Sequence, residues 1–148
     1  TGYFKKVKLK PTLSKIHQEL YEVVKKYNDY SVIVHFDLIK RYDDKNGYSR
    51  FESNKEIITT ILKYIIKDGK RIKLNTSSAR YGLDDLMHQK NTKTFYDLGG
   101  RIITIGSDSH KSTHFLDTYV GEMKDELRKT NFKEFCIYKQ MKPILHKL

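Results

Sequence analysis

The 148-residue sequence contains a single cysteine, Cys136, and no long uninterrupted apolar run. One cysteine excludes an intrachain disulfide framework and is typical of a protein kept in a reducing compartment. A membrane span needs about 20 consecutive apolar residues, and the first ten residues are Lys-rich without the apolar segment that a signal peptide requires. We therefore expect a cytoplasmic protein in which Cys136 is a small buried core residue.

The sequence also lacks any concentration of its positive charge. It has 29 Lys and Arg against 18 Asp and Glu, a net charge of +11, and such a chain attracts phosphates, nucleic acids and anionic surfaces. The lysines are spread along the whole chain, however, and no compact Arg-rich block stands out. Solvated lysine faces are therefore favoured over a dedicated nucleic-acid site, which stays an alternative.

Hydrophobic periodicity predicts four helices and four strands in strict alternation, within one domain. We expect helices at about 12–27, 57–66, 89–98 and 115–129, and strands at 31–36, 71–75, 101–105 and 132–138. Ser53 and Glu56 form a capping-box pattern, and Gly69 and Gly99 are typical helix stops. The alternation favours parallel strands joined by helices, either in an open sheet or in about half of a barrel.

Polar side chains follow three of the predicted strands, at the ends where α/β folds place their reactive groups. These clusters are His35 with Asp37, Asn75 to Ser77 with Arg80, and Asp108 with His110.

Asp108 and His110 are two positions apart, so in an extended backbone their side chains lean to one side. A carboxylate and an imidazole suit Zn, Mn or Fe, although a polar turn that caps the next helix fits the same pattern. His35 is either a further ligand or a satisfied core histidine. His17 is expected on the surface.

Arg41 and Arg80 each follow a strand end by a few residues. A guanidinium at such a place can bind two phosphate oxygens in a fork that lysine does not reproduce. Surface ion pairs are the alternative for both residues.

These clusters lie in segments that resemble a known family. Segment 35–43 is similar to the third metal motif of histidinol phosphatases of the polymerase-and-histidinol-phosphatase (PHP) superfamily. Segment 75–83 resembles their substrate loop, 98–111 their last metal motif, and 132–135 with 141–143 the end of the family sequence. The similar segments run in the family's order over nearly all of the chain.

The resemblance implies an α/β fold, the C-terminal part of a distorted (β/α)7 PHP barrel with about four βα units, as one partial domain over residues 1–148. It implies that His35, Asp108 and His110 are metal ligands and catalytic residues, and that Arg41 and Arg80 grip the substrate phosphate. The implied reaction is the hydrolysis of L-histidinol phosphate to L-histidinol and phosphate in histidine biosynthesis, with Zn, Mn or Fe as cofactor.

Three departures from the family pattern qualify these expectations. The His-x-His motif of the family's N-terminus is absent, so roughly the first three strands and part of the metal cluster are expected to be missing. Lys73 stands where the substrate loop usually has a glutamate, and Val34 and the pair 78–79 also differ. A separate N-terminal half, or a homodimer, is the expected partner. An inactive, truncated binding or structural module is the alternative.

Overall fold

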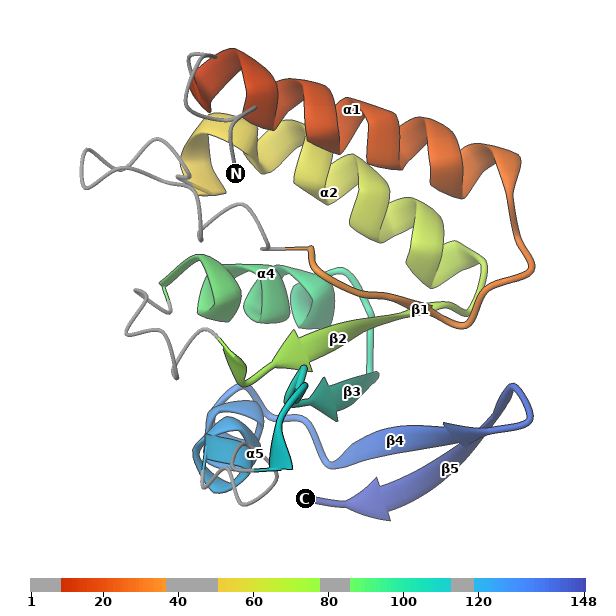
Figure 1. Cartoon of the computed structure of the whole chain (residues 1–148), viewed down its shortest axis with the longest axis vertical. Coiled ribbons are helices and arrows are strands. Elements are labelled where there is room, and N and C mark those ends of the chain that lie inside the picture. The colour runs from red at the N-terminus through yellow and green to blue at the C-terminus, as the bar shows by residue number, and fades with distance from the viewer. Residues whose placement is uncertain (1–8, 37–50, 78–85, 113–118) are drawn as a thin grey trace.

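The computed structural model describes residues 9–36, 51–77, 86–112 and 119–148, drawn in colour in Figure 1. Its elements are α1 (Leu9–Lys26), β1 (Val32–Ile33), α2 (Phe51–Lys67), β2 (Arg71–Asn75), α4 (Leu86–Asp97), β3 (Ile102–Gly106), α5 (Tyr119–Lys129), β4 (Glu134–Lys139) and β5 (Lys142–Lys147). The predicted alternation of helices and strands is confirmed as far as β4. Within the described residues, none of the helices is long and apolar enough to cross a membrane.

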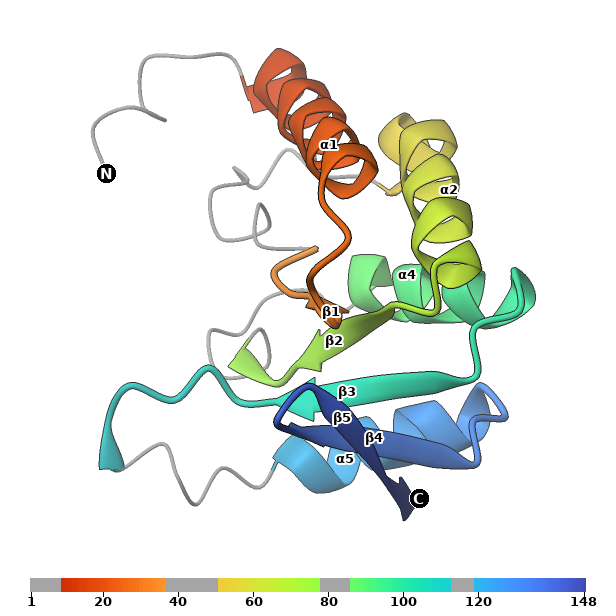
Figure 2. The same cartoon turned by 90° about the vertical axis from the view of Figure 1, so that its right-hand side faces the viewer.

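The strands form one curled sheet in the order β1-β2-β3-β4-β5 (Figure 2). The first four strands are parallel, and strands that follow each other in the sequence lie next to each other in the sheet. Sequential parallel strands joined by helices are the arrangement of a barrel wall. The described part of the chain is thus a mixed α/β half-barrel.

The expected four parallel strands are present, and a fifth strand that was not predicted follows them. β5 runs antiparallel to β4, and a two-residue turn at Gln140 and Met141 joins them. Both turn residues have positive φ, 50° and 60°, as in the tight turns that usually contain Asn-Gly. Neither residue is of that type, so the sequence carried no turn signal. Pro143 fits in β5 because this strand lies at the sheet edge.

The helices and one face of the sheet share a single hydrophobic core. On the sheet side, Ile33, Ile72, Leu74 and Ile103 are each at most 8% exposed. The helices contribute, among others, Ile58, Ile61, Leu62, Ile65, Phe95, Met123 and Leu127. α1 lies beside α2, and α2 beside α4 (Figures 1 and 2). Each such side chain contributes about 1.5–3 kcal/mol when buried, which holds the helices against the sheet.

Three helices end in the same way, with a left-handed residue before the next strand. These residues are Gly69 after α2, Gly99 after α4 and Asn131 after α5, with φ of 66°, 104° and 72°. In α4 the amide of Gly100 donates to the carbonyl of Phe95 at 2.9 Å, the long bond of a Schellman motif. The predicted stops at Gly69 and Gly99 are confirmed, whereas the stop at Asn131 was not predicted.

α2 begins at Phe51, before the predicted capping box. Ser53 and Glu56 therefore lie inside the helix, and the capping-box prediction is wrong. Phe51 is 5% exposed, and Lys90 of α4 pairs with Glu52 at 2.7 Å. Burial of Phe51 against the core extends the helix beyond the position that its sequence pattern suggests.

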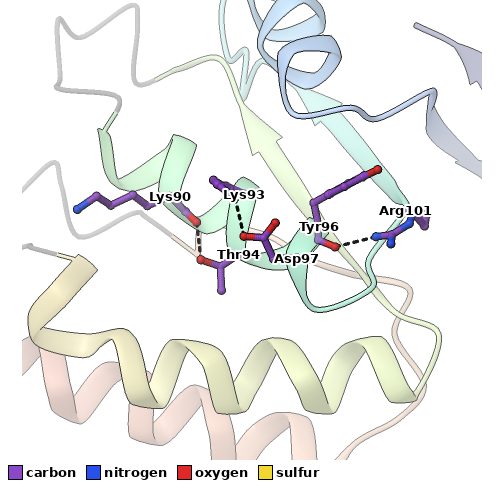
Figure 3. A network of polar contacts seen from close by, with 6 residues as sticks. All are labelled: Lys90, Lys93, Thr94, Tyr96, Asp97 and Arg101. Carbon is purple, nitrogen blue, oxygen red and sulfur yellow. Dashed lines mark hydrogen bonds and ion pairs between the residues drawn. The ribbon is translucent and has the colours of Figure 1, made fainter.

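The outer surface of α4 carries a set of short-range polar contacts (Figure 3). Lys93 pairs with Asp97 at 2.7 Å, one helical turn apart. Arg101 donates to the carbonyl of Tyr96 at 2.7 Å and lies over the Tyr96 ring at 4.3 Å. A cation at the last carbonyls of a helix is favourable, so Arg101 fixes the point where α4 ends and β3 begins.

Candidate functional site

Asp108 lies between two histidines that come from different parts of the chain. Its Oδ1 atom is 4.0 Å from Nε2 of His35 and 3.9 Å from Nε2 of His110. His35 follows β1, whereas Asp108 and His110 follow β3. Since the carboxyl ends of parallel strands meet at one edge of a sheet, the structure brings the three predicted ligands together there.

The backbone is held in an unusual conformation at two of these residues. His35 and Asp108 have φ of 58° and 53°, the left-handed region in which residues with a Cβ are uncommon. Such residues cost on the order of 1 kcal/mol each and cluster at functional sites. The expected extended backbone does not continue through Asp108, and the turn brings its carboxylate toward both imidazoles.

The three side chains differ in their access to solvent. The Asp108 side chain is 17% exposed and that of His35 is 35% exposed, whereas His110 is 84% exposed. The Nδ1 atom of His35 is buried and has no hydrogen-bond partner among the described residues. His35 is therefore not a core histidine whose hydrogen bonds are satisfied within the described residues. An unpaired buried nitrogen costs about 1–3 kcal/mol, and a native protein that accepts this cost needs a reason for it, such as a functional role of the ring or a bound water or ion.

The donor types at this edge suit a divalent metal such as zinc. Ligand atoms around tetrahedral zinc lie about 3.4 Å apart, somewhat closer than the 3.9 and 4.0 Å found here. Across the described ranges, no three His, Cys, Asp or Glu side chains are close enough to hold a metal as they stand. Both histidines face the same carboxylate, that of Asp108. If each of the two distances to Asp108 became shorter by roughly half an ångström, both would match the spacing of ligand atoms around zinc.

The second predicted cluster forms a buried turn at the end of β2. The amide of Ser77 donates to Oδ1 of Asn75 at 3.1 Å, and the amide of Thr76 donates to the carbonyl of Gly106 at 2.9 Å. An asparagine that bonds the backbone two residues on is a common turn device. These bonds join the ends of β2 and β3 beside Asp108.

Several predicted site residues lie outside the described residues. They are Asp37, Arg41 and Arg80. Their roles stay predictions from the sequence.

The expectation for His17 is wrong. It was expected on the surface, but it is 3% exposed, and its ring lies 5.9 Å from that of Phe36. His17 is followed at three and seven residues by Leu20 and Val24, both part of or packed on the core. This helical spacing is the signal in the sequence that indicates burial of His17.

Cys136 is a buried core residue, as expected, with 0% exposure. Burial raises the pKa of its thiol, so it is mostly protonated at neutral pH. Arg71 donates to the hydroxyl of Tyr138 at 2.9 Å on the same side of the sheet. Both Arg71 and Tyr138 act to lower the pKa of the thiol, but burial outweighs them, so the thiol is not activated as a nucleophile.

Comparison with known proteins places the chain among histidinol-phosphatases. It is 31% identical over 109 residues to a probable histidinol-phosphatase of Thermotoga maritima and 27% identical over 122 residues to the histidinol-phosphatase of Lactococcus lactis. These alignments cover 73% and 82% of this chain but 44% and 45% of the relatives. The chain thus spans a little under half the length of the curated relatives it matches.

A solved structure has the same fold over nearly all of this chain. It is a histidinol phosphate phosphatase of Lactococcus lactis complexed with zinc, L-histidinol and phosphate, with a TM-score of 0.80 and 20% identity. The likeness covers 97% of this chain and 55% of that one. No protein-family model matches the chain. On its sequence relationships, the chain belongs to the histidinol-phosphatase family.

Proposed function

We propose that this chain forms the C-terminal part of a metal-dependent phosphomonoester hydrolase that converts L-histidinol phosphate to L-histidinol and phosphate, a step of histidine biosynthesis. The observation that carries the proposal is the meeting of His35, Asp108 and His110 at the carboxyl edge of the sheet, in a chain 31% identical to a probable histidinol-phosphatase. The zinc, L-histidinol and phosphate in the solved neighbour support the class of cofactor and substrate.

In this proposal His35, Asp108 and His110 hold a divalent metal ion, for which zinc has the best support. A bound divalent metal would neutralise charge on the phosphate oxygens and make water a better nucleophile at neutral pH. Asp108, shared by the two imidazoles, sets their positions. Arg41 and Arg80 would bind the phosphate oxygens through their guanidinium forks.

The rest of the site would come from polypeptide outside these 148 residues. The finer architecture that we propose is a PHP-type (β/α)7 barrel, supported by the sequential parallel order of β1 to β4. Within the described residues, no strand pairs with the outer edge of β1. The opposite edge, β5, has only exposed residues, among them Lys142, Pro143 and Lys147, which oppose further strand pairing.

A completing strand would therefore add at β1, and it would belong to an N-terminal half or to a second copy of the chain. Mass measurement in solution, with and without the N-terminal half of a histidinol-phosphatase relative, separates these two sources. A monomer that keeps its fold without metal, and that does not associate with the half, would instead favour an inactive binding module.

Phosphate release from L-histidinol phosphate tests the proposed activity. The chain is assayed with zinc or manganese, alone and together with the N-terminal half. We expect release in the complemented assembly, loss of release with Asp108→Asn, and no loss with Asp125→Asn, which changes an exposed carboxylate on α5. No release from a complemented assembly that demonstrably contains metal would refute the activity.

A further inference from the structure

The side chain of Lys73 lies across Gly106 of the neighbouring strand. A Cβ atom on Gly106 would be 2.9 Å from Cδ of Lys73, 3.3 Å from Cε and 3.4 Å from Nζ. Carbon atoms in favourable contact are about 3.5–4.0 Å apart. The absence of a side chain at Gly106 therefore provides the space in which the lysine side chain lies.

This contact shows the direction in which the lysine extends. Lys73 is paired with Thr104, whereas Gly106 is paired with Asn75, two residues closer to the carboxyl ends of the strands. The ammonium group is thus displaced along the sheet toward the edge, where Asp108 follows Gly106 by two residues. Because side chains alternate along a strand, Lys73 lies on the face opposite the core residue Leu74.

The charge of Lys73 has no counterpart in the described part of the chain. The residue is half-buried, and none of the ion pairs and hydrogen bonds among the described residues involves its Nζ. By contrast, Lys90 and Lys93 of α4 pair with Glu52 and Asp97, each at 2.7 Å. A partly desolvated ammonium without an anionic partner is unfavourable, so an anion that meets it gains a charge-assisted hydrogen bond.

From this placement we propose that Lys73 is a further substrate-binding residue, whose ammonium group binds an oxygen of the substrate's phosphate at the carboxyl edge of the sheet. The inference rests on the proposed function and names a phosphate contact within that site. A lysine ammonium is a compact charge on a flexible stem, so it can follow a dianionic phosphate.

Inorganic phosphate is the probe for this contact, since it binds without any reaction. Its dissociation constant is measured by calorimetric titration of the zinc-loaded chain, of four single variants, and of the double variant that combines Gly106→Ala with Lys73→Met. Lys73→Met removes the charge and keeps the length of the stem, and Lys73→Arg keeps the charge. Lys63→Met changes the net charge equally at an exposed position on α2. Gly106→Ala places a methyl group where the lysine stem lies.

We expect phosphate to bind Lys73→Met at least about tenfold more weakly than the wild-type chain, as for the loss of a charged hydrogen bond. Gly106→Ala should weaken binding in the wild-type background but not in Lys73→Met, because both changes act through one ammonium group. Lys73→Arg should retain most of the affinity, and Lys63→Met should stay within about twofold of the wild type.

Equal phosphate affinity for Lys73→Met and Lys63→Met would overturn the inference, and so would a wild-type chain that does not bind millimolar phosphate. Unchanged circular dichroism of the variants shows that folding is not the cause of a loss. The role of Lys73 and the proposed activity can fail independently of each other. Lys73-dependent phosphate binding without hydrolysis in the complemented assembly would refute only the activity. Hydrolysis with a KM for L-histidinol phosphate that Lys73→Met leaves unchanged would refute only the role of Lys73.

Discussion

The Nε2 atom of His35 lies 4.0 Å from Oδ1 of Asp108, although the two residues follow strands that are not neighbours in the sheet. β2 lies between β1 and β3, and both residues have a left-handed backbone. Their meeting therefore depends on the register of three strands and on two turns. The rigidity of the helix-covered sheet is a condition of the site, and it can be tested apart from activity.

The two glycines Gly100 and Gly121 are predicted to respond to alanine in opposite directions. A Cβ on Gly100 would lie 2.3 Å from Cε1 of Phe95, whose ring is 1% exposed and has little room to move. Gly100→Ala should cost about 1–3 kcal/mol of unfolding free energy. Gly121 lies in α5 with nothing within 4 Å of such a Cβ, so Gly121→Ala should add roughly 0.5–1 kcal/mol. Urea unfolding measures the change in unfolding free energy for each variant. An equal change for Gly100→Ala and Gly121→Ala would contradict the packing at Phe95.

The core beneath the sheet is predicted to depend on α2. Leu62 is 0% exposed, so Leu62→Ala should lower the unfolding free energy by about 2–5 kcal/mol through lost burial and a cavity. Val23 of α1 is 49% exposed, so Val23→Ala should change the unfolding free energy by no more than about 0.5 kcal/mol. Denaturant titrations of both variants give the comparison. A small effect of Leu62→Ala would mean that α2 is not packed as described.

The order of helices and strands was predictable because each core-facing segment repeats its apolar residues with a clear period. In α2 the buried residues Ile58, Ile61, Leu62 and Ile65 follow helical spacing, and β2 has the bounds predicted for it. β5 was not predictable in this way. All six of its residues are exposed, so no buried face imposed an alternating pattern on its sequence.

The site was predictable in part, and for a similar reason. His35, Asp108 and His110 could be expected to meet because they follow parallel strands, whose carboxyl ends share an edge. The left-handed backbone at His35 and Asp108 had only a weak signal, since His and Asp adopt this conformation more often than most residues but still rarely. The position of the Lys73 ammonium was not predictable either, because it depends on a contact with Gly106 of another strand.

Cys136 is predicted to make stability depend on pH in the alkaline range. Burial raises the pKa of its thiol above the ordinary value of 9.0, so the folded state holds this proton more strongly than the unfolded state does. The stability from this group is complete below the unfolded pKa and is lost as pH rises through the folded one. The unfolding free energy, measured with urea, should fall less between pH 7.5 and pH 9.5 for Cys136→Ala than for the wild type. The same decrease in both would exclude the thiol as its source.

Substitutions in the turn between β4 and β5 are predicted to raise the thermal stability of the protein. Gln140 and Met141 have φ of 50° and 60°, and left-handed residues with a side chain cost roughly 1–2 kcal/mol each. The double change Gln140→Asn with Met141→Gly should therefore raise the midpoint of thermal unfolding. Gln140→Val should lower it, because a β-branched residue is strained at positive φ. A lower midpoint for the double variant would contradict the turn geometry.

The most direct test of the site is a zinc titration against a competing chelator, for the wild-type chain, Asp108→Asn and Asp125→Asn. Asp108 is the carboxylate that His35 and His110 share, whereas Asp125 pairs with Arg128 on the surface of α5. The wild type and Asp125→Asn are predicted to bind zinc with equal affinity, and Asp108→Asn at least about tenfold more weakly. Equal zinc affinity in all three proteins, or no binding to any of them, would contradict a metal site at His35, Asp108 and His110.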